Sequence, residues 1–165
     1  MGLRFYAVSP DCSQRMAKID EIGARILREL TKDGRISNIE LADRVGLSPS
    51  ACLRRVAAME ATGIIKKYRA VLDPAALGLG FAAYITVGLN DHSKEGQEAF
   101  ERAVSRFDEV RECHNITGAV EYLLRVEAAD LPAFKVFHTE KLGVLPQVRQ
   151  LVTHVVMGSP KDERA

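Results

Sequence analysis

The 165-residue chain has no tryptophan, only three cysteines and no uninterrupted apolar run long enough to cross a bilayer. Cys12, Cys52 and Cys113 show no paired spacing such as CxxC, so neither a disulfide framework nor a zinc cluster is indicated. Nothing is expected to span a membrane, and residues 1–18 lack the apolar core of a secretion signal. We therefore expect a cytoplasmic protein without a metal or other cofactor.

A large excess of charge of one sign is also missing, because the formal net charge is only +1. The charge is nevertheless divided unevenly. Residues 1–79 hold thirteen Lys and Arg against nine Asp and Glu, whereas residues 80–165 hold ten against thirteen. Attraction to phosphate depends on the local field rather than on the total, so the basic first half remains suited to nucleic acid.

Residues 34–69 contain the capping pattern of a helix-turn-helix. Ser37 and Glu40 have the spacing of a capping box, in which the serine hydroxyl accepts a hydrogen bond from the first turn of a helix. Gly46 can adopt the left-handed conformation that ends this helix and turns the chain. An earlier helix near Ile19 is predicted from apolar residues at spacings of three and four, and it is expected to pack behind the pair.

The second helix of this pair has the features of a helix that reads DNA. Ser48 is placed to cap it and Pro49 occupies its first position, and the helix is expected to end near Gly63. A side that is small at the start and basic one turn later can enter a major groove and bind phosphate or guanine. We expect Cys52, Leu53, Val56 and Met59 to face the core, and Ser50, Ala51, Arg54 and Arg55 to face outward.

Residues 64–72 mix β-branched apolar residues with cations, which predicts a strand with one basic face. Lys66 and Lys67 on this strand are candidates for contact with phosphate. Asp73 and Pro74 then break the pattern. The expected plan is a flexible arm at 1–17, a helix-turn-helix domain at 18–69, a linker strand and hinge at 70–80, a second domain at 81–158 and a tail at 159–165.

The second half predicts the order strand, helix, strand, strand, helix, strand. This βαββαβ order is the ferredoxin-like arrangement, an α+β fold with one antiparallel sheet and both helices on one face. Apolar residues occupy both faces of the strands, so a second subunit is expected to cover the open face. Strands are expected at 81–89, 110–117, 121–127 and 143–157, and helices after Ser93 and Asp130, the latter with Leu131, Phe134 and Phe137 buried.

The turn between the two middle strands of this half is the candidate effector site. A glycine there lets backbone N–H groups approach a ligand, and a carboxylate can hold an amino group. A plain hairpin turn is the alternative. The residues of this loop are Thr117, Gly118, Ala119, Val120 and Glu121.

No catalytic group is expected. The four histidines have no ligand spacing on a common element. Cys113 and His114 are neighbours on a predicted strand, so their side chains point to opposite faces and do not form a nucleophile and base.

These motifs together resemble the Lrp/AsnC family of bacterial and archaeal transcription regulators, the leucine-responsive or feast/famine regulators. The run from IDEIGARILREL through GLSPSACLRRV to LDPAALGLG is similar to that family's amino-terminal half, and HNITGAVEYLLRVEAADLPAF resembles its ligand-sensing RAM domain. The resemblance implies a winged-type helix-turn-helix, sequence-specific binding to double-stranded promoter DNA, and a response to an amino acid or related metabolite. It also implies homodimers that assemble into an octamer or a similar disc.

In that family the effector loop is typically Gly-Asp-Tyr-Asp, and it lines a pocket between dimers. This chain keeps the glycine at Gly118 and an acid at Glu121. The family's connecting strand pairs across subunits, which the resemblance implies for residues 64–72 as well.

Three other interpretations stay open. The chain could be a nucleoid-associated architectural protein that binds DNA without an effector. It could be an enzyme, because the sirohaem decarboxylases resemble the same two-half architecture, although the small, basic outer side of the second helix is typical of the regulators. The plainest alternative is an ordinary pair of packed helices with two solvated arginines.

Overall fold

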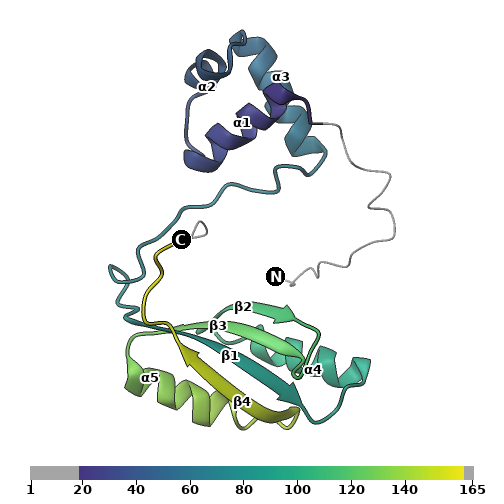
Figure 1. Cartoon of the computed structure of the whole chain (residues 1–165), viewed down its shortest axis with the longest axis vertical. Helices are drawn as coiled ribbons and strands as arrows, with labels where there is room; N and C mark the ends of the chain where they lie inside the picture. The colour runs from purple at the N-terminus through teal and green to yellow at the C-terminus, as the bar shows by residue number, and fades with distance from the viewer. Residues whose placement is uncertain (1–18, 162–165) are drawn as a thin grey trace. The chain divides into compact units, whose positions relative to one another are not determined.

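The computed structural model of the protein describes residues 19–161. The chain divides into two compact units, with the boundary between Ala70 and Val71 (Figure 1). The expected arm at 1–17 and the end of the expected tail lie outside the described residues. Between residues 19 and 161, no helix is long and apolar enough to cross a membrane. Each unit has its own hydrophobic core.

The first unit contains the helices α1 (Glu21–Lys32), α2 (Asn38–Val45) and α3 (Pro49–Ala61). Each helix begins at a side-chain cap. Asp20 Oδ1 accepts from the Gly23 N–H at 2.8 Å, and Ser37 and Ser48 cap α2 and α3 in the same way. The core between the three helices is formed by Ile26, Leu41, Ala42, Val45, Cys52 and Met59.

The turn between α2 and α3 is made at Gly46. Its φ of 74° lies in the left-handed region, as the sequence predicted. The Leu47 N–H then donates to the Ala42 carbonyl oxygen at 2.9 Å, which closes the end of α2. This turn sets the direction in which α3 leaves α2.

The second unit is a four-stranded antiparallel sheet in the order β2-β3-β1-β4 (Figure 1). Side chains of both helical segments share one buried cluster with alternate residues of the strands, so the helices cover the same face. This is the expected ferredoxin-like α+β fold. Its elements are β1 (Phe81–Leu89), α4 (Lys94–Val104), β2 (Val110–Asn115), β3 (Tyr122–Ala128), α5 (Leu131–Val136), the π-helix η1 (Phe137–Leu142) and β4 (Val148–Val155).

The opposite face of the sheet carries no helix among the described residues. Tyr84 and Leu123 lie on it half-buried, and Val152 is 39% exposed. On the same face Glu127 accepts from Arg111 Nε at 3.0 Å and pairs with Arg125 Nη2 at 2.8 Å. The face is therefore part apolar and part ionic.

Several expectations about elements are wrong. Residues 64–72 form no strand within the chain, because a strand needs a neighbour to bond and none of the described segments pairs with this one. The pairing across subunits that the resemblance implies for them stays a prediction. The strand expected at 110–117 ends at Asn115, and the strand expected from residue 143 begins only at Val148. Residues 143–147 instead form a turn closed by a hydrogen bond from the Val148 N–H to the Leu145 oxygen at 3.0 Å.

Two leucines expected in the cores are exposed. Leu53 on α3 is 59% exposed and Leu131 at the start of α5 is 60% exposed. Leu53 follows the buried Cys52 directly, and adjacent residues of a helix point about 100° apart. Leu131 occupies the first turn of α5, whose buried contact is made one turn later by Phe134.

Candidate nucleic-acid interface and ligand loop

The outer face of α3 is the side of the helix opposite its buried residues, and it is exposed to solvent. Ser48, Pro49, Ser50 and Arg54 are exposed, and Ala51 is half-buried. The Ser48 hydroxyl accepts from the Ala51 N–H and lies 3.3 Å from the Ser50 hydroxyl. A cap, a second hydroxyl and a guanidinium thus lie along the first turns of one helix. Such groups can donate to phosphate oxygens and base edges.

Arg55 differs from its neighbour Arg54. Its Nη1 donates to both carboxylate oxygens of Asp20 at 2.8 Å, and its side chain is only 36% exposed. The Gly23 N–H and, next, the Arg55 guanidinium hold the pKa of Asp20 below its ordinary value of 3.8. Arg55 therefore links α3 to Asp20, the residue directly before α1. The sequence predicted instead that the Arg55 side chain faces outward.

The start of α3 is also fixed by α2. Asn38 Nδ2 donates to the Pro49 carbonyl oxygen at 2.8 Å. At the other end of α2, Arg44 pairs with Glu40 at 2.6 Å and with Glu29 of α1 at 2.9 Å. One half of the expected capping box is formed, because the Glu40 N–H donates to the Ser37 hydroxyl at 3.2 Å. The Glu40 carboxylate pairs with Arg44 of the same helix. These contacts hold the three helices in one orientation.

Lys66 and Lys67 lie beyond the end of α3 and are exposed. Gly63, with a φ of 76°, turns the chain out of the helix just before them. Tyr68 returns to the helix, where its hydroxyl donates to Glu60 Oε1 at 2.9 Å. The two lysines are therefore kept near the last turn of α3 although no strand forms there.

The candidate effector loop projects from the end of the β2–β3 hairpin. It is closed by the Ile116 N–H, which donates to the Glu121 oxygen at 2.8 Å. Thr117, Gly118 and Ala119 are exposed and Val120 is half-buried. Gly118 has a φ of 145°, which favours glycine, and an added Cβ would meet nothing within 4 Å. The loop thus offers backbone groups to open space.

Glu121 is already engaged by its own chain. Its Oε2 accepts from the Leu89 N–H at 2.7 Å, its Oε1 lies 3.0 Å from His92 Nδ1, and its side chain is 17% exposed. His114 pairs with Glu112 at 3.2 Å instead. Sequence reasoning missed His92 and Leu89 because they lie about thirty residues from Glu121 and no local pattern connects them.

Comparison with known proteins identifies both units. Residues 19–66 match the model of a winged helix-turn-helix DNA-binding domain, and residues 82–165 match the Lrp/AsnC ligand binding domain. The chain belongs to the Lrp/AsnC family. It is similar to the leucine-responsive regulatory protein of Escherichia coli K12, with 41% identity over 152 residues, which are 92% of this chain and 93% of that protein.

Solved structures of other members have the same fold. A transcriptional regulator of Neisseria meningitidis, solved as a complex with L-methionine, is 36% identical with a TM-score of 0.83, covering 87% of this chain and 92% of that one. A feast or famine regulatory protein of M. tuberculosis, also complexed with L-methionine, is 28% identical with a TM-score of 0.79, covering 89% and 97%. This Lrp/AsnC chain is therefore a DNA-binding transcription regulator with a ligand-binding domain, from a regulatory family.

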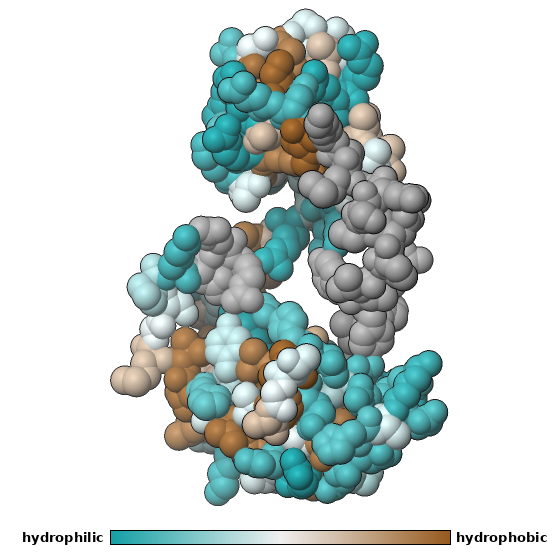
Figure 2. All heavy atoms as spheres, turned by 45° about the vertical axis from the view of Figure 1, so that its right-hand side comes forward, coloured by the Kyte–Doolittle hydropathy of each residue, from teal (hydrophilic) through white to brown (hydrophobic). Residues whose placement is uncertain are grey.

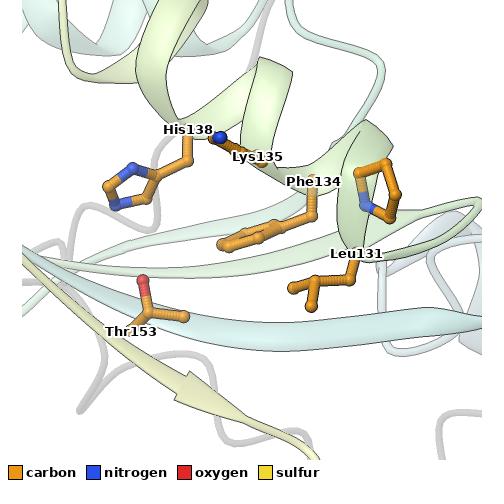
Figure 3. A pocket seen from close by; sticks show the side chains of 6 residues that line it. Leu131, Phe134, Lys135, His138 and Thr153 are labelled. Carbon is orange, nitrogen blue, oxygen red and sulfur yellow. The ribbon is translucent and has the colours of Figure 1, made fainter.

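The ligand-binding domain of this Lrp/AsnC member also contains an open groove of about 630 Å³ beside β4 (Figure 3). Phe134 and Leu131 make its apolar floor, while Lys135, His138 and Thr153 place polar atoms at its edge. No residue of the 117–121 loop lines it. The groove and the loop are thus two separate features of the domain.

The cysteine and histidine on β2 are placed as the strand geometry predicted. Cys113 packs against the helix-covered core, whereas His114 is exposed beside Glu112. Burial, with a smaller effect of the Glu101 carboxylate, raises the pKa of the Cys113 thiol to about 12. A thiol that stays protonated at neutral pH is a poor nucleophile.

Proposed function

We propose that the outer face of α3, formed by Ser48, Pro49, Ser50, Ala51 and Arg54, is the surface with which this regulator reads promoter DNA. The observation that supports this most is the exposure of Ser50 and Arg54 on a capped helix within the segment that matches a winged helix-turn-helix. Small residues at the start let the backbone approach a major groove. The guanidinium one turn later can bind phosphate or the O6 and N7 atoms of guanine.

The two arginines have different roles in this proposal. Arg54 contacts DNA through the whole guanidinium. Arg55 has its Nη1 on Asp20, so it reaches phosphate only through its remaining N–H groups while it orients α3. Lys66 and Lys67 add phosphate contacts beyond the helix, where they are exposed.

We propose that the effector is an amino acid and that Thr117, Gly118, Ala119, Val120 and Glu121 bind it. The loop is exposed around Gly118, and the two related regulators described above were solved with L-methionine. The ligand's carboxylate would accept from backbone N–H groups of the loop. Its ammonium would bind Glu121 Oε1 in exchange for His92, because that oxygen is now 3.0 Å from the imidazole.

Binding of the effector acts on the assembly. We propose that the chain forms homodimers which associate further, with 70–80 as linker and hinge between a DNA-binding domain at 18–69 and a RAM domain at 81–158. A dimer places two copies of α3 about one helical turn of DNA apart, and this matches an imperfect palindrome. By linkage, the effector changes DNA binding only as far as its affinity differs between the assembled states.

Footprinting of the full-length protein on promoter and random DNA, with and without a panel of amino acids, tests the DNA-binding part. We expect protected half-sites about one helical turn apart on promoter DNA, and a footprint that changes with at least one amino acid. Uniform coverage of both DNAs that ignores every amino acid would instead favour the architectural, nucleoid-associated function.

A thermal-shift screen of the twenty amino acids tests the effector part. A true effector at a hundredfold its Kd should stabilise the protein by about 2.7 kcal/mol. Gly118→Asp and Ala119→Arg should remove the shift, whereas Gly158→Asp outside the loop should retain it. Ala119→Arg is included because it adds bulk and positive charge without straining a glycine backbone. A shift that survives both loop variants, in proteins with normal circular dichroism, would place the site elsewhere.

A further inference from the structure

Leu53 is an exposed apolar side chain in the middle of α3, where a core residue was expected. Exposed apolar side chains occur on both units (Figure 2), so exposure alone indicates nothing. Leu53 differs from the other exposed apolar residues in its position on α3. Pro49, Leu53 and Ala57 are spaced by four residues and are all exposed, so they form an apolar strip along one side of the helix.

This strip runs beside the polar groups proposed to read DNA. Ser50 and Arg54 directly follow Pro49 and Leu53, and on an α-helix they lie on the neighbouring side. A duplex that lets Arg54 reach base edges therefore brings the Leu53 side chain into the same groove. Ala57, one turn further on, is too small to keep the duplex away.

A leucine in a major groove can distinguish bases by apolar contact alone. It has no donor or acceptor, and the C5-methyl of thymine is the apolar group that base pairs display in this groove. We propose that Leu53 packs against a thymine methyl in each half-site and so selects an A·T pair there. This inference rests on the proposed DNA-reading role of α3 and adds a specificity determinant to it.

Duplex DNA fits this strip better than a second copy of the chain does. The strip is narrow and is bordered by the cation of Arg54, which attracts phosphate but interrupts an apolar protein interface. If the strip contacted a second copy of the chain instead, replacing Leu53 would change the oligomeric state, so the two occupants can be told apart.

The test uses uracil, which pairs like thymine but lacks the methyl. A high-affinity duplex is first selected from a random pool with the full-length protein. Each thymine is then replaced by uracil in turn, and Kd is measured for the wild type, Leu53→Ala and Leu77→Ala. Leu77 is the matched control because it is also an exposed leucine, at 58%, but lies outside the first unit.

We expect one uracil position per half-site to weaken wild-type binding about fourfold, which corresponds to roughly 0.8 kcal/mol for one buried carbon group. Leu53→Ala should bind the thymine and uracil duplexes equally at that position, and Leu77→Ala should behave as the wild type. Because Leu53 is exposed, its replacement should leave the unfolding temperature nearly unchanged.

Several results would overturn the proposal. These are equal uracil sensitivity in Leu53→Ala and wild type, a wild type that tolerates uracil at every position, or a Leu53→Ala protein whose molar mass changes while its uracil sensitivity does not. Failure to select any bound duplex would instead contradict the DNA-reading function of α3 itself, so the two failures are distinguishable.

Discussion

Arg54 and Arg55 are neighbours on α3, but their side chains have different surroundings. Arg54 is exposed, whereas Arg55 is held by the Asp20 carboxylate. Successive residues of a helix point about 100° apart, so only one of the pair can lie opposite the core. The sequence predicted both as outward-facing, because nothing local indicates that Asp20 reaches across from before α1.

The Asp20 carboxylate, which caps α1 and pairs with Arg55, predicts a dependence of stability on pH. The pKa of Asp20 is lowered on folding, chiefly by the Gly23 N–H and then by Arg55, so its contribution is present above pH 3.8 and is lost as the pH falls through its folded pKa. Asp20→Asn keeps a capping side chain but removes the charge. Its unfolding free energy should therefore fall less steeply below pH 3.8 than that of the wild type.

Urea denaturation at several pH values between neutrality and acid checks this expectation. Glu95→Gln is a suitable control, since Glu95 is exposed on α4 in the other unit. Parallel pH curves for wild type and Asp20→Asn would show that the charge of Asp20 contributes nothing to stability.

At the scale of helices and strands, what the sequence could predict was mostly local. Side chains of Ser37 and Ser48 cap α2 and α3 as their positions indicated, because a cap depends only on the next three residues. The strand expected at 64–72 does not form within the chain for the opposite reason. Its pattern of branched and cationic residues fits a strand, but a strand also needs a partner, which a local pattern does not supply.

Gly46 gives the sharpest prediction at this scale. It holds a φ of 74° with no atom close to where a Cβ would lie, so Gly46→Ala adds backbone strain without a steric clash. A left-handed conformation costs an L-residue roughly 1–2 kcal/mol, and the unfolding free energy of the first unit should fall by about that amount. Gly46→Asn should lose less, because asparagine tolerates this region better.

Chemical denaturation followed by helical circular dichroism measures both variants. A stability for Gly46→Ala equal to the wild type would mean that the turn between α2 and α3 is not held in the left-handed conformation.

At the scale of the whole molecule, the proposed assembly depends on the face of the sheet that the helices leave open. Tyr84 and Leu123 lie half-buried on it next to the ions around Glu127. The sequence predicted apolar residues on both sides of these strands but gave no sign of the ion pairs, of which one joins Arg111 of β2 to Glu127 of β3 and the other lies within β3, between Arg125 and Glu127. It likewise predicted the loop at Gly118 but not that Glu121 is held by Leu89 and His92.

If a second copy covers this face, Leu123→Asp should break the assembly, because it would bury an unpaired carboxylate. Light scattering after size-exclusion chromatography should then give a smaller molar mass than for the wild type. Val144→Asp, at an exposed apolar residue between η1 and β4, should leave the mass unchanged. A wild-type mass for Leu123→Asp would mean that subunits associate through another surface.

The most direct test of the central claim, that the outer face of α3 reads DNA, is the salt dependence of operator affinity for wild type, Arg54→Ala and Arg106→Ala. Arg106 is the control, as an exposed arginine just after α4. We predict that Arg54→Ala either lowers the slope of log K against log salt by about one phosphate contact or loses about 1–3 kcal/mol at one guanine, while Arg106→Ala changes neither. An Arg54→Ala protein with wild-type affinity and slope, particularly if Arg55→Ala behaves the same, would contradict the account.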